Sequence, residues 1–493
     1  MNDKKYTIVS GSGAGGMTLA LLLAKAGRRV CVVECQKSIG GYLRRYRRDG
    51  VLIDTGYHFS GGFTGVMSQM NRVLEIDDLV TATPISHKIS LSDPGFEVTF
   101  PAGACIDDVA AICAGAFPRE ASAVRRYFEI EKEIWNSTPL HDLNDPPGHG
   151  VALGRYDMVT ASEVVAGLGL SPQAALAVNS FAMCHGTPLC EAPMSFHARA
   201  GFSLHDDLSR PAGGGTPVID GFLRGASKYG IRVETNCTVT GISSPGAGSD
   251  ACRFVTLSNG ETLEVEDLFF TTHPSAAVSV MPEELLTPSF MRRIRRLKES
   301  TGFFTAVFSV DDENAAFEEG LVSSFSTSDI DDILLDGVKG YSTGIVFGRE
   351  TDDRGISRKL VTAFRTMRLG RDRFPLLHSQ RLKDEEYQKF KSEQVSSIER
   401  QIISLRPELD GKLRCIVSAT PLSCLDYDPP TGSAYGARCV CGEARMCGRI
   451  GLSNLHFAGQ SSLVPGVMGT MLTSFAVFRQ AVGEEVWKQV VKL

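Results

Sequence analysis

The sequence predicts an α/β fold whose first part is a doubly wound parallel sheet. Three stretches near the N-terminus support this prediction. A β-rich run, KYTIVSGSG (residues 5–13), ends in glycines, and the helix-forming stretch GMTLALLLAKAG (16–27) stops at its last glycine. RRVCVVE (28–34) has the composition of a second strand. A strand, a helix and a strand in this order form a β-α-β unit, which begins a parallel sheet.

Composition excludes several classes of protein. The 493 residues suffice for two or three domains, and 43% hydrophobic with 22% charged residues is a globular balance. A formal charge of -6 argues against a general affinity for nucleic acids. Thirteen irregularly spaced cysteines and no secretory signal indicate a reducing, cytoplasmic setting. No run reaches the roughly 18 uncharged apolar residues of a membrane helix, so we expect at most peripheral contact with a membrane.

The first glycine turn predicts a dinucleotide site. Gly11, Gly13 and Gly16 satisfy the pattern G-x-G-x-x-G, in which the glycines allow a tight turn, a close approach to a pyrophosphate and close packing of helix on strand. The helix N-terminus offers free N–H groups to phosphates. Glu34 ends the second strand, where an acid accepts hydrogen bonds from ribose hydroxyls. The turn alone does not distinguish NAD from FAD.

A second glycine loop follows soon after this unit. Gly40 and Gly41 are expected to form a tight backbone loop near the pyrophosphate, and the stretch DTGYHFSGG (54–62) combines glycines with Tyr57 and His58. Together with the first turn, these residues resemble the flavin amine oxidase and phytoene desaturase superfamily. Within it, DTGYHFSGG is similar to the retinol saturase and carotenoid isomerase branch. Later stretches at 191–215, 421–436 and 455–475 resemble that branch as well.

The resemblance implies an FAD site assembled from several segments. It assigns the first turn and Glu34 to the ADP part of FAD, and the double glycine with Arg44 to the pyrophosphate. It places Val239 at the strand whose backbone meets the adenine. The C-terminal positions that it implies beside the phosphate, the ribityl chain and the flavin are Gly459, Gln460, Pro465, Gly466, Val467 and Met468.

Two positions depart from the pattern of many relatives. Tyr42 follows the double glycine where many have arginine, although Arg44 and Arg45 are close by. Gln460 replaces an aspartate. Both departures point away from the amine oxidases, and they leave open which charges surround the phosphates.

We predict a discontinuous domain organisation. Residues 1–75, 211–285 and 415–493 are expected to form a Rossmann-like, two-dinucleotide-binding FAD domain. Residues 76–210 and 286–414 are expected to form an inserted, mixed α+β substrate domain with a helical part.

The catalytic candidates lie near the predicted flavin. A flavin performs the hydride chemistry itself, so the protein needs to supply a dry pocket and one proton donor or acceptor. We predict His58, Tyr57 and Tyr435 for this role, and the alternative for each is packing around the pocket. A structural role is favoured for His185 and His197. Cys439, Cys441 and Cys447 lack a convincing metal-ligand spacing, so no metal is predicted.

The resemblance implies an FAD-dependent oxidoreductase that reduces a carbon–carbon double bond of an apolar polyene, retinoid or carotenoid-like compound by hydride transfer from flavin N5. Desaturation or isomerisation within the same family is the alternative. Two other classes are kept open: an amine oxidase, and a non-enzymatic lipid-binding escort similar to the Rab GDP-dissociation inhibitors. The electron donor is left open between NAD(P)H and another external reductant, and the oligomeric state is not predicted.

Overall fold

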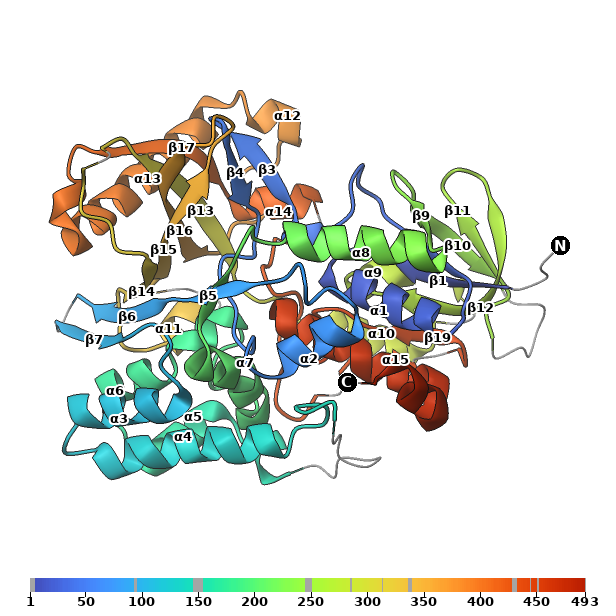
Figure 1. Ribbon diagram of the computed structural model, residues 1–493, viewed down its shortest axis with the longest axis horizontal. Helices are drawn as coiled ribbons and strands as arrows, with labels where there is room; N and C mark the ends of the chain where they lie inside the picture. The colour runs from blue at the N-terminus through green and yellow to red at the C-terminus, as the bar shows by residue number, and fades with distance from the viewer. Residues whose placement is uncertain are drawn as a thin grey trace.

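The computed structural model describes residues 5–92, 95–144, 154–243, 251–283, 286–312, 314–335, 339–427, 432–443, 445–449 and 452–492. Two sheets organise these residues, one of eight strands and one of seven, and helices pack on both (Figure 1). The predicted α/β class is therefore confirmed.

The first sheet contains the predicted β-α-β unit. Its parallel part runs in the order β9-β2-β1-β12-β19. Helix α1 (Ala14–Lys25) connects β1 to β2, as the sequence predicts. The parallel strands are β1 (Tyr6–Ser10), β2 (Val30–Val33), β9 (Arg232–Glu234), β12 (Thr262–Phe270) and β19 (Leu455–Phe457).

Alternate side chains of these strands enter two separate cores. Val9 and Val32 contact the helical side, where α1, α2 (Val66–Val73), α8 (Thr216–Tyr229) and α15 (Gly466–Val490) pack. Ile8 and Val33 face the opposite side. Side chains alternate between the two faces of a strand, and both faces of a buried parallel sheet are apolar. The second face therefore needs a cover, which α9, α10 and an antiparallel extension of the sheet provide. Its elements are β10 (Val239–Ser243), β11 (Phe254–Leu257), α9 (Pro274–Val278) and α10 (Pro288–Arg296), and β18 (Gly448–Arg449) pairs with β19.

The second sheet is mostly antiparallel, in the order β17-β13-β16-β15-β14-β6-β7, and only β14 and β6 run parallel. Helix α13 (Glu385–Leu405) covers one face, where Ile398 and Ile402 are fully buried. The strands are β6 (Ser86–Leu91), β7 (Phe96–Phe100), β13 (Gly302–Val310), β14 (Gly320–Phe325), β15 (Ser342–Thr351), β16 (Ser357–Met367) and β17 (Leu413–Ala419).

A group of helices packs beside β6, β7 and β14 and shares one hydrophobic core with them (Figure 1). These helices are α3 (Ile106–Ala116), α4 (Ala121–Asn136), α5 (Ala161–Leu168), α6 (Pro172–Val178) and α7 (Met194–Asp206). The shorter elements are β3 (Arg45–Arg48), β4 (Val51–Asp54), β5 (Ala82–Pro84), β8 (Ser209–Pro211), α11 (Asp331–Leu334), α12 (His378–Arg381), α14 (Pro421–Tyr427) and the 3-10 turns Gly41–Leu43, Arg155–Asp157, Ser180–Cys184 and Pro407–Leu409.

The two sheets can be compared with the predicted domain segments. Every strand of the first sheet lies within 1–75, 211–285 or 415–493. The boundary at residue 415, however, falls inside β17, whose hydrogen bonds to β13 place it in the second sheet. The boundary after residue 285 adjoins residues 284–285, which lie outside the described residues. The division into domains stays a prediction.

Candidate functional site

One cavity of about 620 Å³ opens at the carboxyl ends of β1 and β2 and brings most predicted site residues together. In a doubly wound sheet this edge is where ligands bind. Gly40 and Gly459 do not line it. The predicted residues that do are Gly11, Gly13, Gly16, Glu34, Gly41, Arg44, Tyr57, His58, Val239, Tyr435, Gln460, Gly466, Val467 and Met468.

The first glycine turn has the geometry of a phosphate-binding turn. Gly11 has a φ of +101°, and a Cβ on Gly16 would lie 2.0 Å from the carbonyl oxygen of Gly11. A Cβ on Gly13 would meet no protein atom within 4 Å, so the backbone there faces open cavity. No side chain caps α1, and its first turn carries no acidic residue. These features fit an anionic dinucleotide bound at the helix N-terminus.

Glu34 is fixed against this turn. Its Oε2 accepts hydrogen bonds from the backbone N–H of Ser12 at 3.0 Å and from the Ser12 hydroxyl at 2.5 Å. Its Oε1 accepts one from the Gln36 N–H at 2.8 Å. The carboxylate is 7% exposed and lines the cavity directly after β2. Its position fits the predicted contact with a ribose.

The second glycine loop packs on the first. The N–H of Gly40 donates to the carbonyl of Ser12 at 3.0 Å, and a Cβ on Gly41 would lie 3.0 Å from the Cα of Gly13. Gly40 has a φ of +114°, and a Cβ there would lie 2.4 Å from a methyl carbon of Ile219. Gly40 therefore shapes the loop, while Gly41 faces the cavity.

The two arginines after the double glycine have different surroundings. Arg44 lines the cavity and donates from Nε to the carbonyl of Gly41 at 3.1 Å. Arg45 instead forms ion pairs with Asp54 at 2.8 Å and Glu350 at 2.7 Å. Of these two cations, only Arg44 contributes charge to the cavity wall.

The C-terminal segment closes the same cavity. A Cβ on Gly459 would lie 2.4 Å from the carbonyl oxygen of Thr271, so this glycine lets the chain pass the end of β12. Gln460 lines the cavity, and Pro465 leads into α15, whose first three residues also line it. The Ser474 hydroxyl donates to the carbonyl of Gly15 at 2.9 Å, which joins α15 to the start of α1.

Tyr57 and His58 lie on the loop between β4 and α2. Burial raises the pKa of Tyr57 far above its usual value, so its phenol is protonated at neutral pH. His58 stacks on Phe364, with ring centroids 5.3 Å apart and planes 9° apart. Burial, with a smaller contribution from Arg210, lowers the pKa of His58 to about 4. A neutral imidazole is a weak acid, so this pKa favours the packing alternative over the general-acid role predicted for His58.

Tyr435 lies next to Phe303, whose ring also meets Phe364, the residue on which His58 stacks. Its ring meets Phe303 edge-on at 6.1 Å. Burial raises the pKa of Tyr435 well above its usual value, and the Cys184 thiol beside it acts in the same direction. The phenol therefore keeps its proton across the physiological range. Tyr57 and Tyr435 thus both carry a proton at neutral pH, and Tyr435 is the one whose ring contacts the aromatic wall through Phe303.

The wall beyond the nucleotide end includes residues that the sequence analysis did not identify. Phe303 and Thr305 on β13 point to the same side of the second sheet as Phe364, since Thr305 is paired with Phe364 across β13 and β16. Period-two alternation predicts that these side chains share a face, but not that this face lies opposite the glycine turn. Among the described lining residues, Glu34 and Arg44 are the only Asp, Glu, Lys or Arg side chains.

His185 and His197, for which a structural role is favoured, form a buried chain of hydrogen bonds that does not line the cavity. The N–H of Thr187 donates to Nδ1 of His185 at 3.1 Å, so His185 must donate from Nε2 to Nδ1 of His197 at 2.9 Å. His197 in turn donates from Nε2 to the Tyr127 hydroxyl at 2.9 Å. Burial lowers the pKa of His185 well below its usual value and that of His197 to about 3. These contacts fit the structural role favoured for both.

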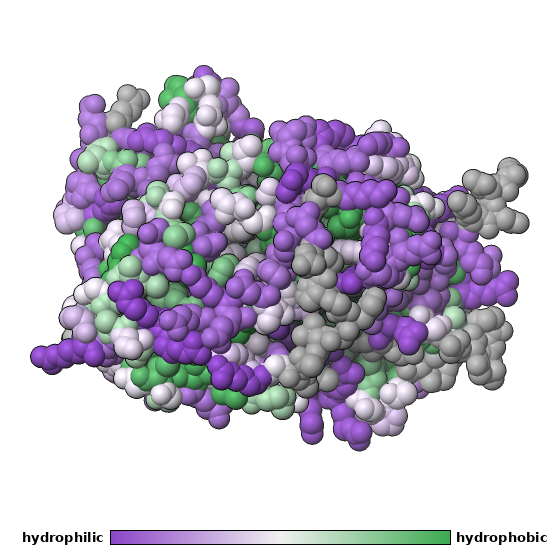
Figure 2. Space-filling view, turned by 60° about the horizontal axis from the view of Figure 1, so that its bottom comes forward, coloured by the Kyte–Doolittle hydropathy of each residue, from purple (hydrophilic) through white to green (hydrophobic). Residues whose placement is uncertain are grey.

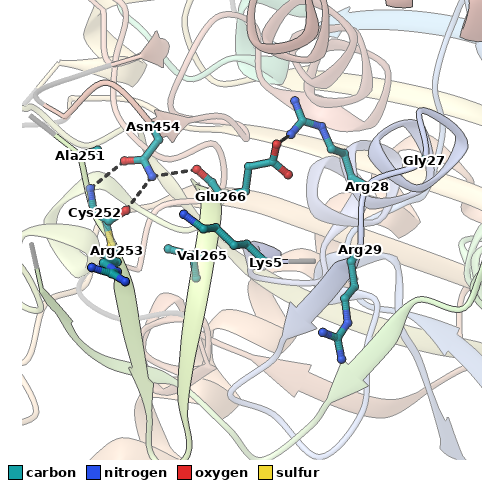
Figure 3. A pocket seen from close by; sticks show the side chains of 10 residues that line it. All are labelled: Lys5, Gly27, Arg28, Arg29, Ala251, Cys252, Arg253, Val265, Glu266 and Asn454. Atoms are coloured by element: carbon teal, nitrogen blue, oxygen red, sulfur yellow. Dashed lines mark hydrogen bonds and ion pairs between the residues drawn. The ribbon is translucent and has the colours of Figure 1, made fainter. Parts of the chain in front are cut away.

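We assign no chemistry to the cysteines or to a second pocket. Cys439 is buried, and within the described residues no group of three His, Cys, Asp or Glu side chains is arranged to hold a metal ion. A pocket of about 830 Å³ lies at the amino ends of β1 and β2, where Arg28 is paired with Glu266 (Figure 3). It is at the edge opposite the glycine turn, away from the usual ligand position of this type of sheet.

Three observations bear on contact with a membrane. No helix within the described ranges is long and apolar enough to cross a bilayer. On the face in Figure 2, hydrophilic residues predominate and hydrophobic ones form small groups. The basic stretch 286–301 contains α10. Its Phe290 is buried in the core on the side of the first sheet that faces away from α1. The buried side of α10 therefore accounts for its amphipathic pattern.

Comparisons with known proteins agree with this site. A family model for an NAD(P)-binding Rossmann-like domain matches residues 9–74, from β1 to α2. The chain is 23% identical to the all-trans-retinol 13,14-reductase of Macaca fascicularis over 97% of this chain and 86% of that protein. It is 30% identical to the chloroplastic prolycopene isomerase 2 of an Oncidium hybrid cultivar over 28% of this chain and 24% of that protein.

A solved structure confirms the fold. Wild-type putrescine oxidase bound to putrescine superposes with a TM-score of 0.61 at 14% identity, covering 97% of this chain and 98% of that chain. Such identity establishes the shared fold and not the substrate. The resemblance predicted from the sequence is confirmed. This chain is therefore similar to the retinol 13,14-reductases and the prolycopene isomerases over the shares given above, and it has the same fold as putrescine oxidase.

Proposed function

We propose that the protein binds FAD and reduces a carbon–carbon double bond of an apolar polyene, of the retinoid or carotenoid-like type. The observation that carries this proposal is the single cavity, which joins a dinucleotide-binding turn to an uncharged, aromatic wall. The relatives that act on retinol and prolycopene support it, since their names refer to conjugated, apolar substrates.

The residues of the nucleotide end fit FAD. The turn at Gly11–Gly16 and the N-terminus of α1 would hold the pyrophosphate, Glu34 the ribose, and the backbone at Val239 the adenine. The first turn of α15 would lie along the flavin. When bound and reduced, the flavin supplies a hydride to one alkene carbon.

The aromatic wall suits a neutral, extended substrate. Phe303, Phe364 and the neutral ring of His58 present apolar faces, which can stack on a conjugated chain. A protonated amine would need a carboxylate, and the described lining offers only Glu34, which already accepts four hydrogen bonds. These surroundings argue against an amine oxidase.

Tyr435 is the proposed proton donor for the second alkene carbon. Hydride on one carbon and a proton on the other complete the reduction, and water or an external acid then restores the phenol. Its raised pKa means that the proton is present at any physiological pH. The Cys184 thiol beside it would hold the hydroxyl in position.

Tyr435→Phe is expected to lower the rate of alkene reduction about 100-fold, because it removes a general acid while keeping the ring. FAD affinity should stay unchanged, since the hydroxyl lies away from the nucleotide end. Single-turnover oxidation of the reduced flavin by substrate measures the rate. Tyr57→Phe is the matched comparison, because Tyr57 is also buried and protonated. An equal loss in Y57F alone would transfer the role to Tyr57.

The decisive experiment for the whole proposal is anaerobic. The purified flavoprotein is reduced with dithionite and mixed with a panel of retinoids, carotenoids and small unsaturated acids. Rapid flavin reoxidation by polyenes, with one saturated bond per flavin, is the expected result. Reduction of oxidised FAD by a saturated polyene would instead establish a desaturase. Geometric isomers formed without net electron transfer would establish an isomerase, the alternative that the similarity to prolycopene isomerase favours.

The other two classes have simple tests. Colourless protein that takes up no FAD would indicate a lipid-binding escort. Hydrogen peroxide release from a panel of amines would indicate an amine oxidase. Adding NADPH or NADH in place of dithionite tests whether a nicotinamide is the electron donor. Flotation with liposomes tests the expected peripheral membrane contact of a cytoplasmic protein.

A further inference from the structure

Helix α14 reaches from the second sheet to the nucleotide end of the cavity. It follows β17 directly, and two of its residues, Cys424 and Tyr427, line the cavity. Tyr427 is the last residue of the helix and is 47% exposed. Both residues lie in the stretch 421–436, which resembles the related branch, but neither was assigned a role at the cofactor.

Tyr427 contacts Gln36 and Arg44, which lie beside the predicted ribose and pyrophosphate positions. The guanidinium carbon of Arg44 lies over its ring, 4.4 Å from the centroid. The side-chain amide of Gln36 donates to its carbonyl oxygen at 3.1 Å. Gln36 also donates its backbone N–H to Glu34, and Arg44 donates to Gly41. Both contacts therefore come from residues bound to the turn region.

The rest of α14 is anchored on α12 and α13, which lie outside the segments predicted for the FAD domain. Asp426 is paired with Arg381, whose side chain is 2% exposed, and with His378 at 2.9 Å. Just before the helix, the Thr420 hydroxyl is hydrogen-bonded to that of Tyr387 at 2.9 Å. The helix is thus held just before its first residue and at Asp426, and Tyr427, which follows Asp426, lines the cavity and is partly exposed.

We propose that Tyr427 is an FAD-retaining residue: its ring and the Arg44 guanidinium cover the ribose and pyrophosphate end of bound FAD. This rests on the proposed FAD site. Bound FAD would leave only after the ring separates from Arg44. The stack also holds Arg44 at the rim, where its charge favours the pyrophosphate. The anchoring of α14 on His378 and Arg381 would in this way control how long the site keeps its cofactor.

The test measures FAD release from purified holoprotein. Dilution into buffer that contains an FAD-scavenging apoprotein is followed by the change in flavin fluorescence. Tyr427→Ala is expected to raise the dissociation rate about fivefold, the order expected for losing an exposed cation–π contact. Tyr427→Phe keeps the ring and should restore the slow rate. In an Arg44→Ala background, the tyrosine substitution should add little, because the two side chains act together.

Tyr341→Ala is the matched control. Tyr341 is 37% exposed and has the guanidinium carbon of Arg365 at 4.4 Å from its ring, but it does not line the cavity. It should release FAD at the wild-type rate. Wild-type release from Y427A, or equally fast release from Y341A, would overturn the proposal. A protein that binds no FAD at all would instead overturn the proposed function, so the two failures are distinguishable.

Discussion

Gly16→Ala is expected to abolish FAD binding and to lower the stability of the fold, because it disturbs the packing of α1 against the turn after β1. A Cβ at this position would lie 2.0 Å from the carbonyl oxygen of Gly11 and 2.9 Å from its carbonyl carbon. Both are backbone atoms, so the clash cannot be relieved by rotating a side chain. Such overpacking typically costs about 1–3 kcal/mol of unfolding free energy. Either α1 or the turn must move, and the phosphate site is lost with the original spacing.

Gly13→Ser is expected to separate binding from folding. Gly13 has a φ of -68° and caps α1, and a Cβ there meets no protein atom within 4 Å. Serine is a favoured helix N-cap, so stability should be unchanged or slightly higher. The same Cβ would occupy the open space in which a pyrophosphate must approach the backbone. We expect at least about a tenfold loss of FAD affinity, or about 1.4 kcal/mol.

Fluorescence titration of apoprotein with FAD, together with thermal unfolding of each apoprotein, measures both effects. The two variants serve as controls for one another, because one should lose stability and binding and the other binding alone. Full FAD affinity in G13S would show that the cofactor does not approach Gly13. It would then remove the turn from the binding site.

A loss of folding stability as the pH falls from about 6.5 to about 4.5 is the second large effect expected. Burial lowers the pKa of His58 to about 4 and the pKa values of His87 and His197 to about 3, and it lowers that of His185 as well. Since the unfolded-state pKa is about 6.5, the unfolded chain binds more protons than the folded one between these values. Stability is therefore fully present above pH 6.5 and is lost as the pH falls through about 6 toward 4.

Each such histidine contributes a slope of about 1.4 kcal/mol per pH unit, so four together give up to about 5 kcal/mol per pH unit near pH 5. That is a large share of a typical stability of about 5–15 kcal/mol. Carboxylates such as Glu75, whose pKa the Lys228 ammonium and other partners lower to about 2, act below about pH 4.5. The interval from pH 5 to 6.5 thus reports mainly on the histidines.

Urea unfolding midpoints measured at several pH values check this expectation. His87→Gln removes one titrating group outside the cavity, and its amide can replace the hydrogen bond from Nε2 to the Ser323 hydroxyl, now 2.9 Å long. The slope between pH 5 and 6.5 should fall by about a quarter in this variant. A midpoint that stays constant from pH 5 to 7 would show that these histidines are not held neutral by burial.

The nucleotide half of the site was predictable because its constraints are local. A strand, a turn and a helix follow one another within some twenty residues. Gly16 is required by the carbonyl oxygen of Gly11 five residues earlier, and Gly13 leaves open space for a ligand. Glu34 was predictable for the same reason, since the end of β2 lies beside the end of β1. The roles assigned to Gly466, Val467 and Met468 came from the resemblance, and the structure places all three on the same cavity.

Other features depended on packing over long sequence distances. Arg44 and Arg45 are adjacent and chemically alike, but only the ion pairs to Asp54 and Glu350 turn Arg45 away from the cavity. His58 has an unremarkable sequence context, and its lowered pKa arises from burial. The predicted boundary at 415 falls inside β17, and the local sequence does not reveal this because the pairing partner β13 lies about a hundred residues earlier.

The sequence by itself determined the α/β class, the dinucleotide turn and the double-glycine loop, because each depends on residues that are close together in the chain. The resemblance of several short motifs indicated the related families. The tertiary structure decided the other half of the cavity. It brought Phe303 and Phe364 onto the same cavity as the glycine turn and placed the Tyr427 ring against Arg44. Alternation along a strand defines two faces, but which face borders the cofactor is set only when distant segments pack together.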